Sequence, residues 1–541
     1  MPSRTGSPMS CLRPRAVLAV MLLAALFPAL LFARGAPPSP LQAGQPGKRP
    51  NILFIAVDDL RPELGCYGNT YVKSPSIDRL AKEGVVFTRA YCQQAACNQS
   101  RASLLTGLRP DTLRVWDLKT DFRTNMSDAV TLPQYFKSQG YHAANIGKIF
   151  HNTIPDPLSW SEPDLHIDGY PFDPDAVYLN PENIALQEQR KQEIIEQGLQ
   201  ERYVDRFGKW YLKTMATEIA DAPDNAYYDG AQTDVAIEKL RELKERGQPF
   251  FFAIGYYRPH LPFNVPRKYW DLYEREKIPL AANPFVPKGA PLMAINTLRE
   301  LRSYTDFKEA PHPAQGSLTE AEQRLLKHGY LASVSYVDTQ IGRLLGALDT
   351  LGLRKETIIV LWGDHGWKLG EHNSWCKMTN YEVDTRAPLI ISAPGVPANG
   401  RRCDRLVEFV DIYPTLCELA GLGVPSGLEG TSAAALLQDP RRPWKSAAFT
   451  QFLREGQWVA PDGIVYMGYA IRTERHRYVE WFRWEAKELA ARELYDLETD
   501  PQENVNVVED PANAALVTEL AARLKAGWRA ARPPGAAVLP R

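Results

Sequence analysis

Three apolar runs, each followed by acidic or imidazole side chains, constrain the fold of this chain more than any other feature. Residues 51–57 (NILFIAV) lead into an Asp-Asp pair, residues 250–257 (FFFAIGYY) lead into Arg-Pro-His, and residues 357–363 (TIIVLWG) lead into Asp-His. Continuous apolar runs of this length are typical of strands buried on both faces of a sheet. Ligands of open α/β sheets bind beyond the carboxyl ends of the strands. We therefore expect these polar residues to line one crevice.

Segments with helical spacing lie between these runs. Residues 76–84 and 128–140 predict short helices, residues 320–353 predict one long helix or two, and residues 388–394 predict a fourth strand. Alternation of buried strands and helices indicates an α/β fold, with a large, mainly parallel or mixed sheet sandwiched by helices. Residues 181–213 form a charged, helical-looking insert that we interpret as a solvated face.

The character of the chain changes after about residue 439. Aromatic and charged residues alternate at 448–452, 468–472 and 477–484, which predicts antiparallel strands, and residues 511–530 predict a final amphipathic helix. We therefore expect a large domain over residues 49–440. A smaller C-terminal α+β subdomain that carries an antiparallel sheet would follow over residues 441–541.

The N-terminal segment has the pattern of a targeting signal. Positive charges precede an apolar run at residues 16–32, which predicts a signal peptide over residues 1–35 and a Pro/Ala/Gly-rich linker over residues 36–48. The alternative is an uncleaved anchor, but the run is interrupted by Pro28 and is near the lower limit for spanning a bilayer. We expect an exported protein, periplasmic or extracellular, without a stable membrane anchor.

The overall charge excludes one class of partner. Lys and Arg total 63 against 64 for Asp and Glu, a net charge of −1. Dedicated nucleic-acid-binding proteins carry a basic surface, so we expect no nucleic-acid partner.

The residues that follow two of the strands predict a metal site. Asp58 and Asp59 alone would be interpreted as a solvated loop or a helix cap, but adjacent carboxylates in a dry crevice repel each other and need a cation. Asp364 and His365 follow another strand. Three carboxylates and one imidazole suit Ca²⁺ or Mg²⁺ better than Zn²⁺.

Cys97 begins a short apolar helix that ends at Thr106-Gly107. A single cysteine is more often a small buried hydrophobe than a nucleophile, but a helix N-terminus favours an anion. Arg101 lies one turn further along and suits a tetrahedral oxyanion.

Further cationic side chains follow other strand-like segments. Lys148 and His151 lie three residues apart after Gly147, His260 lies between two prolines, and Lys377 follows the Asp-His pair in a loop. Each alone is compatible with a surface lysine or a structural histidine. Around a divalent cation, these groups would form a pocket for a tetrahedral anionic ester.

As a set, these motifs resemble the formylglycine-dependent sulfatases of the alkaline phosphatase superfamily, and among them the iduronate-2-sulfatase group. The resemblance extends from about residue 50 to the ELYDLETDP stretch at residues 493–501. It is carried by the Asp-Asp pair and by residues 97–111, 147–151, 258–263 and 363–377.

The resemblance implies an alkaline phosphatase-like fold and a chemistry centred on Cys97. A maturation enzyme would oxidise Cys97 to formylglycine, whose hydrated aldehyde carries two hydroxyls. One hydroxyl would attack sulfur, and the second, deprotonated with help from His151, would release sulfate. Arg101 would hold the formylglycine.

The resemblance also implies a ligand set and substrate contacts. One divalent cation, Ca²⁺ rather than Mg²⁺, would be held by Asp58, Asp59, Asp364, His365 and the modified Cys97. Lys148 and Lys377 would bind sulfate oxygens, and His260 would protonate the leaving alcohol.

The activity implied is that of a sulfuric ester hydrolase (EC 3.1.6 type). Its substrate would be a sulfated glycan, either a 2-O-sulfated uronic acid or another sulfated polysaccharide sugar. One alternative is a phosphoester or phosphonate hydrolase of the same superfamily.

The maturation motif departs from the family pattern at Gln99, where the family has Pro or Ala. If Gln99 prevents modification, the chain would be a catalytically impaired, glycan-binding pseudo-sulfatase. Residues 98–100 also form an N-glycosylation sequon over the cysteine. A glycan there would block the pocket, so we expect a bacterial host.

Overall fold

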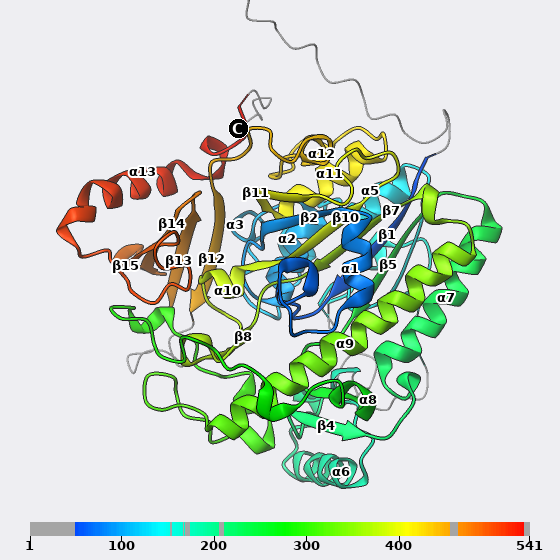
Figure 1. Ribbon diagram of the computed structural model, residues 1–541, viewed down its shortest axis with the longest axis horizontal. Coiled ribbons are helices and arrows are strands. Elements are labelled where there is room, and N and C mark those ends of the chain that lie inside the picture. The colour runs from blue at the N-terminus through cyan, green and yellow to red at the C-terminus, as the bar shows by residue number, and fades with distance from the viewer. Residues whose placement is uncertain are drawn as a thin grey trace, which may run out of the picture. The chain divides into compact units, whose positions relative to one another are not determined.

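A seven-stranded mixed sheet lies at the centre of the structure, a computed structural model that describes residues 49–151, 154–165, 167, 174–204, 210–454 and 464–534 (Figure 1). The strand order is β11-β2-β10-β7-β1-β5-β3. Within this sheet β10 is antiparallel to both neighbours and the other pairings are parallel, which confirms the predicted fold class. The strands are β1 (Asn51–Val57), β2 (Val85–Tyr91), β3 (His142–Gly147), β5 (Phe250–Tyr256), β7 (Thr357–Gly363), β10 (Arg386–Ser392) and β11 (Arg402–Glu408).

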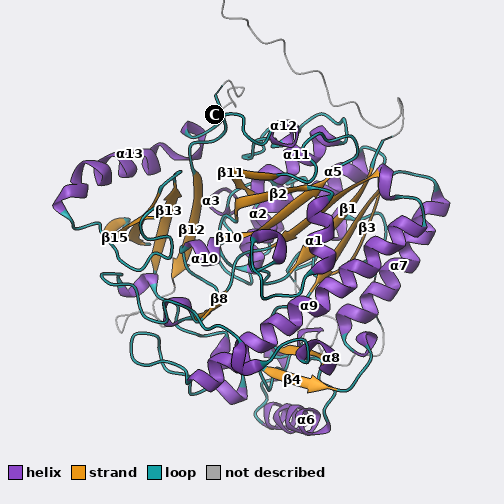
Figure 2. Ribbon diagram, in the orientation of Figure 1, coloured by secondary structure: helices purple, strands orange, loops and turns teal. Residues whose placement is uncertain are grey.

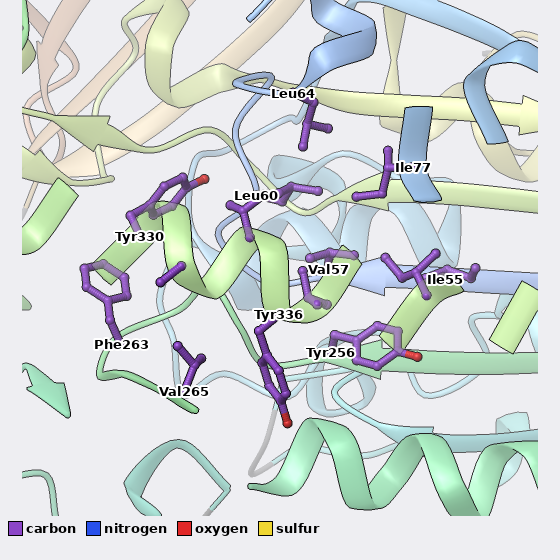
Figure 3. Packing of buried hydrophobic residues seen from close by; sticks show 14 of the residues in the cluster. Ile55, Val57, Leu60, Leu64, Ile77, Tyr256, Phe263, Val265, Tyr330 and Tyr336 are labelled. Carbon is purple, nitrogen blue, oxygen red and sulfur yellow. The ribbon is translucent and has the colours of Figure 1, made fainter. Parts of the chain in front are cut away.

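Helices cover both faces of the sheet (Figure 2). One face packs against α1 (Pro75–Lys82), α7 (Tyr228–Arg246) and α9 (Glu320–Thr350). The other face packs against α2 (Cys97–Thr106), α5 (Leu132–Ser138), α11 (Ile412–Leu419) and α12 (Ala434–Gln438). Figure 3 shows the first core, where Ile55 and Val57 of β1 and Tyr256 of β5 lie beside Tyr336 of α9. The alternate β1 residues Ile52 and Phe54 belong to the second core, so residues 52–57 of the strand are apolar on both faces.

Most of the predicted elements are present, with adjusted ends. Residues 320–350 form one helix, begun by a capping box between Thr319 and Glu322. The predicted helix at 128–140 is shorter, because Thr131 caps α5 at its start. Among the described residues of the insert at 181–213, only α6 (Pro181–Glu196) is α-helical. The sequence patterns did not predict β2 and β11.

The predicted C-terminal antiparallel sheet is confirmed and has four strands in the order β12-β13-β14-β15. These are β12 (Ala448–Arg454), β13 (Tyr466–Arg472), β14 (His476–Arg483) and β15 (Glu488–Asp496). Helix α13 (Ala514–Ala530) covers this sheet, where Leu520 packs with Tyr478 and Leu494. The domain boundary near residue 440 stays a prediction, and the predicted signal peptide and linker (residues 1–48) lie outside the described residues.

Short elements complete the part of the chain that the structure describes. Two small sheets pair β4 (Thr217–Ala220) with β6 (Phe263–Pro266), and β8 (Lys368–Leu369) with β9 (Trp375–Cys376). The short helices are α3 (Pro110–Leu113), α4 (Phe122–Asn125), α8 (Arg267–Trp270) and α10 (Glu382–Thr385). Among the described helices, none combines the length and the apolarity needed to cross a bilayer.

Candidate active site

The residues that follow β1 and β7 meet at one edge of the central sheet. These strands are parallel neighbours in a register that pairs Val57 with Gly363, so the acidic pair after β1 lies beside the Asp-His pair after β7. The Asp59 backbone N–H donates to Asp364 Oδ1 at 3.0 Å. Asp59 has a φ of 57°, a left-handed conformation that Asp tolerates better than most residues. Asp58, Asp59, Asp364 and His365 are all 0% exposed.

Cys97, at the N-terminus of α2, lies against these four residues. Its Sγ is 3.4 Å from His365 Nε2, which is itself 3.4 Å from Asp59 Oδ1. Two sets of three ligand atoms, from Asp59, Cys97 and His365 and from Asp58, Cys97 and Asp364, each lie within 4.8 Å of one another. The oxygen-rich donor set therefore fits a hard divalent cation.

Arg101, one turn into α2, is fully buried and bridges two of the carboxylates. Its Nη2 donates to Asp58 Oδ1 at 3.0 Å and its Nε to Asp364 Oδ2 at 2.9 Å, while Nη1 donates to the carbonyls of Lys148 and Ile149. The guanidinium thus offsets the negative charge of the carboxylates. Its predicted contact with a modified Cys97 stays a prediction.

Lys148 reaches the cluster from the end of β3. Its Nζ lies 2.5 Å from Asp58 Oδ2. Gly255 of β5 allows this approach, because a Cβ on Gly255 would lie 2.0 Å from the Lys148 carbonyl oxygen. The preceding residue, Gly147, has a φ of +75°, which favours glycine. His151 follows on the same segment and is half-buried.

Lys377, in the loop after β9, reaches the carboxylate of Asp59. Its Nζ donates to both oxygens of Asp59, at 2.7 and 3.0 Å. The flanking residues Cys376 and Met378 have φ values of 68° and 85°, so the loop is strained on both sides of the lysine. His372, between β8 and β9, does not face the cluster in this way, because its Nε2 lies 2.7 Å from the Gln502 carbonyl oxygen.

His260 lies beside a carboxylate that the sequence patterns did not predict. His260 Nε2 is 2.9 Å from Glu300 Oε1 and 3.8 Å from Asp59 Oδ2. Lys377 Nζ donates to the same Glu300 oxygen at 3.1 Å. Glu300 immediately precedes a single 3₁₀ turn, Leu301–Ser303, and follows no strand or motif. Only its spatial neighbours reveal it.

Burial and the neighbouring cations shift the pKa values of Asp58 and Asp59 in opposite directions. Burial tends to raise the pKa of Asp58, but Lys148 and Arg101 outweigh it and hold that pKa well below its usual value. For Asp59, burial prevails over Lys377, and the pKa is raised well above its usual value. The adjacent carboxylates of Asp58 and Asp59 thus differ in which form is favoured: the charged form for Asp58 and the neutral form for Asp59.

The Cys97 thiol is not activated in this environment. Burial, reinforced by Asp58 and opposed by the lysines, raises its pKa to about 12. The thiolate is the nucleophilic form of cysteine, so an unmodified Cys97 is a poor nucleophile at neutral pH.

The residues after Cys97 are also buried. Asn98 is 4% exposed, and its amide donates to the carbonyls of Asp117 and Thr120 at 2.9 Å each. Gln99 is 3% exposed. In the folded chain, the predicted glycosylation sequon has no room for a glycan.

Comparisons with known proteins agree with this geometry. A family model described as Sulfatase matches residues 50–422, and one described as N-sulphoglucosamine sulphohydrolase, C-terminal, matches residues 370–529. Iduronate 2-sulfatase of Mus musculus is 36% identical, with 87% of this chain and 93% of the relative covered.

Two solved structures share the fold. A protein in complex with its substrate D-glucosamine-2-N,6-O-disulfate is 24% identical, with a TM-score of 0.67 over 88% of this chain and 97% of the other. The phosphonate monoester hydrolase of Agrobacterium radiobacter is 26% identical, with a TM-score of 0.65 over 88% and 95%. By the extent of the family match and the identity of its relatives, the chain belongs to the sulfatase family and is a sulfuric ester hydrolase.

Proposed function

We propose that this protein is an exported sulfatase that removes the 2-O-sulfate of a uronic acid from a sulfated polysaccharide. The observation that carries the proposal is the position of Cys97 in contact with His365, among three buried carboxylates at the end of the central strands. The similarity to iduronate 2-sulfatase over nearly the whole of both chains supports the choice of sugar.

A divalent cation, Ca²⁺ in our proposal, would be held by Asp58, Asp59, Asp364, His365 and the modified Cys97. It would offset the negative charge of the site and polarise the sulfate group. The donor set fits, because three fully buried carboxylates converge with one imidazole.

Formylglycine made from Cys97 would supply the attacking hydroxyl. The high pKa of the unmodified thiol supports this assignment, because burial and Asp58 outweigh Lys148 and Lys377 and disfavour the thiolate. His151, on the segment after Lys148, would accept the proton whose loss releases sulfate.

The cations of the cluster would bind and protonate the substrate. Lys148 and Lys377 each place an ammonium beside a carboxylate of the cluster and would also bind sulfate oxygens. His260, held by Glu300, would donate a proton to the leaving alcohol. Arg101 would neutralise Asp58 and Asp364 rather than contact the sugar.

A second candidate is a phosphonate or phosphate ester hydrolase. It is favoured by the likeness to the phosphonate monoester hydrolase of Agrobacterium radiobacter. Sulfate and phosphonate esters are both tetrahedral anions, so the two activities are separated by comparing kcat/KM on matched aryl sulfate and aryl phosphonate esters.

The first test is the mass of the peptide that contains Cys97, in protein made together with a formylglycine-generating enzyme. We expect the mass of the aldehyde, trapping by a hydrazide, and release of sulfate from a 2-O-sulfated uronic acid disaccharide. Cys97→Ala should abolish release and leave the circular dichroism spectrum unchanged, whereas Cys66→Ala, in a half-buried cysteine outside the site, should remain active.

The outcomes discriminate between an active sulfatase and a pseudo-sulfatase. Full sulfate release by Cys97→Ala would contradict the mechanism. An unmodified Cys97 after exposure to several converting enzymes, combined with glycan binding and no turnover, would favour a pseudo-sulfatase.

A further inference from the structure

A lysine outside the cluster, Lys213, is fixed between the two segments that carry His260 and Glu300. Lys213 is 9% exposed and lies shortly before β4. The carbonyl of the next residue, Thr214, accepts from the Thr305 N–H at 2.7 Å, and the carbonyl of Ala216 accepts from the Phe263 N–H at 2.8 Å. The backbone of Lys213 is therefore held to both neighbouring segments.

The Lys213 ammonium is flanked by two aromatic rings, and no described carboxylate forms an ion pair with it. Its Nζ lies 5.0 Å from the ring centre of Tyr211 and 5.5 Å from that of Tyr304. In the described part of the chain, no residue forms a hydrogen bond or ion pair with this ammonium, whereas Lys148 and Lys377 each contact an aspartate. Burying an ammonium is costly unless an anion compensates it, and cation–π contacts offset only part of that cost.

Lys213 acts on the carboxylate that contacts His260, the residue that would protonate the leaving alcohol. Burial tends to raise the pKa of Glu300, but Lys377, His260 and, after them, Lys213 outweigh it and hold that pKa well below its usual value. Lys213 is therefore within electrostatic reach of the carboxylate that holds His260. A leaving sugar protonated by His260 would extend toward Lys213.

We propose that Lys213 forms a subsite for a second negative charge on the sugar, either a uronate carboxylate or a second sulfate. This inference rests on the proposed sulfatase function and specifies its substrate as a sugar with two anionic groups. An anionic group of the sugar, flanked by Tyr211 and Tyr304, would accept the charge-assisted hydrogen bond that no described residue accepts from Lys213.

The test compares Lys213→Met and Lys213→Arg with Lys308→Met, a change in an exposed lysine beyond the same segment. The substrates are a 2-O-sulfated uronic acid disaccharide, a disulfated glucosamine and 4-nitrophenyl sulfate, which has no second anionic group. For Lys213→Met we expect kcat/KM on the charged sugars to fall about 10–100-fold more than on the aryl sulfate, mainly through KM, as for loss of one hydrogen bond to a charged group. Lys213→Arg should restore much of the loss, and Lys308→Met should resemble wild type.

Each outcome decides one question. If kcat/KM falls more on the uronic acid disaccharide than on the aryl sulfate, Lys213 binds a carboxylate. If it falls more on the disulfated glucosamine, Lys213 binds a second sulfate. Equal losses of kcat/KM on all three esters would overturn the proposal, because Lys213 would then act only through Glu300. The absence of any loss would overturn it as well.

Binding separates this proposal from the proposed catalytic function. Calorimetry with the desulfated uronic acid disaccharide needs no turnover, and Lys213→Met should weaken its binding about tenfold or more. Wild-type protein that binds this sugar through Lys213 but hydrolyses no sulfate ester would contradict the catalytic function alone. Unchanged binding of this sugar in Lys213→Met, together with an unchanged kcat/KM on the disulfated glucosamine, would contradict the subsite alone.

Discussion

At the scale of single residues, Glu300 connects two cations that reach the cluster from different parts of the chain. One of its oxygens lies 2.9 Å from His260 Nε2 and 3.1 Å from Lys377 Nζ. Under the proposed function these groups contact opposite ends of the ester, so Glu300 is a positioning residue for both. In that arrangement Glu300 would contact neither the sulfur nor the alcohol.

We expect Glu300→Gln to lower kcat about 10–100-fold, because the amide keeps the shape but loses the charge of two hydrogen bonds to cations. Steady-state kinetics on one sulfate ester measure the effect. Glu309→Gln, in an exposed glutamate nearby, is the matched control. Wild-type kcat in Glu300→Gln would show that His260 and Lys377 are positioned without it, and recovery in Glu300→Asp would support a positioning role over a folding role.

At the scale of elements, the spacing between β3 and β5 sets the position of Lys148. The Lys148 N–H donates to the Gly255 carbonyl at 2.9 Å, and the chain passes so close that Gly255 has no space for a side chain. The two strands thus align the backbone from which the ammonium extends to Asp58.

Gly255→Ala should therefore displace Lys148 and reduce kcat/KM at least about tenfold, since small misplacements of reacting groups are costly. Gly346→Ala, at a position of α9 with open space around it, should leave activity intact. The assay is sulfate release from correctly folded protein, checked by circular dichroism. Equal activity in the two variants would mean that the strands separate without moving the lysine.

The burial of each strand explains which elements the sequence predicts. Strands β1, β5 and β7 are buried on both faces, so they appear as continuous apolar runs. Strand β11 (RCDRLVE) lies at the sheet edge and is charged at four of its seven positions, and β2 (VVFTRAY) contains Thr88 and Arg89, so neither has that pattern. Strand-end groups such as Asp58 and His365 were predictable because they follow recognisable strands. Glu300 and Lys213 follow irregular segments, and only tertiary packing brings them to the site.

At the scale of the whole molecule, one half-buried carboxylate connects the segment after Lys377 to the C-terminal sheet. Glu382, in α10, accepts from Arg472 of β13 at 3.1 Å and from Arg477 of β14 at 2.5 Å. Burial tends to raise the pKa of Glu382, but the two arginines outweigh it and lower the pKa to about 2.

This network predicts a pH-dependent stability. Because the folded-state pKa is depressed, the ionised Glu382 stabilises the fold above pH 4.5, its ordinary value, and that contribution is lost as the pH falls from about 4.5 to 2. We expect Glu382→Gln to lower the free energy of unfolding by roughly 3 kcal/mol at pH 7. Urea denaturation from pH 7 to pH 3 should show the deficit shrinking as the pH falls.

The matched control is Glu488→Gln, in an exposed glutamate of β15, which should change stability little at any pH. A deficit in Glu382→Gln that stays constant over the whole pH range would contradict the assigned role of the charge.

The burial of Cys97 has a consequence for biosynthesis. In the folded chain the thiol is 3% exposed and closed in by His365 and Asp364, which are made much later during translation, as is Lys377. At roughly 5–20 residues per second, tens of seconds pass between the emergence of Cys97 and that of these partners. During that interval the cysteine lies on an unfinished chain that cannot yet close around it. Under the proposed function, a converting enzyme would therefore have to act on the unfolded polypeptide, because the completed fold encloses the Cys97 thiol.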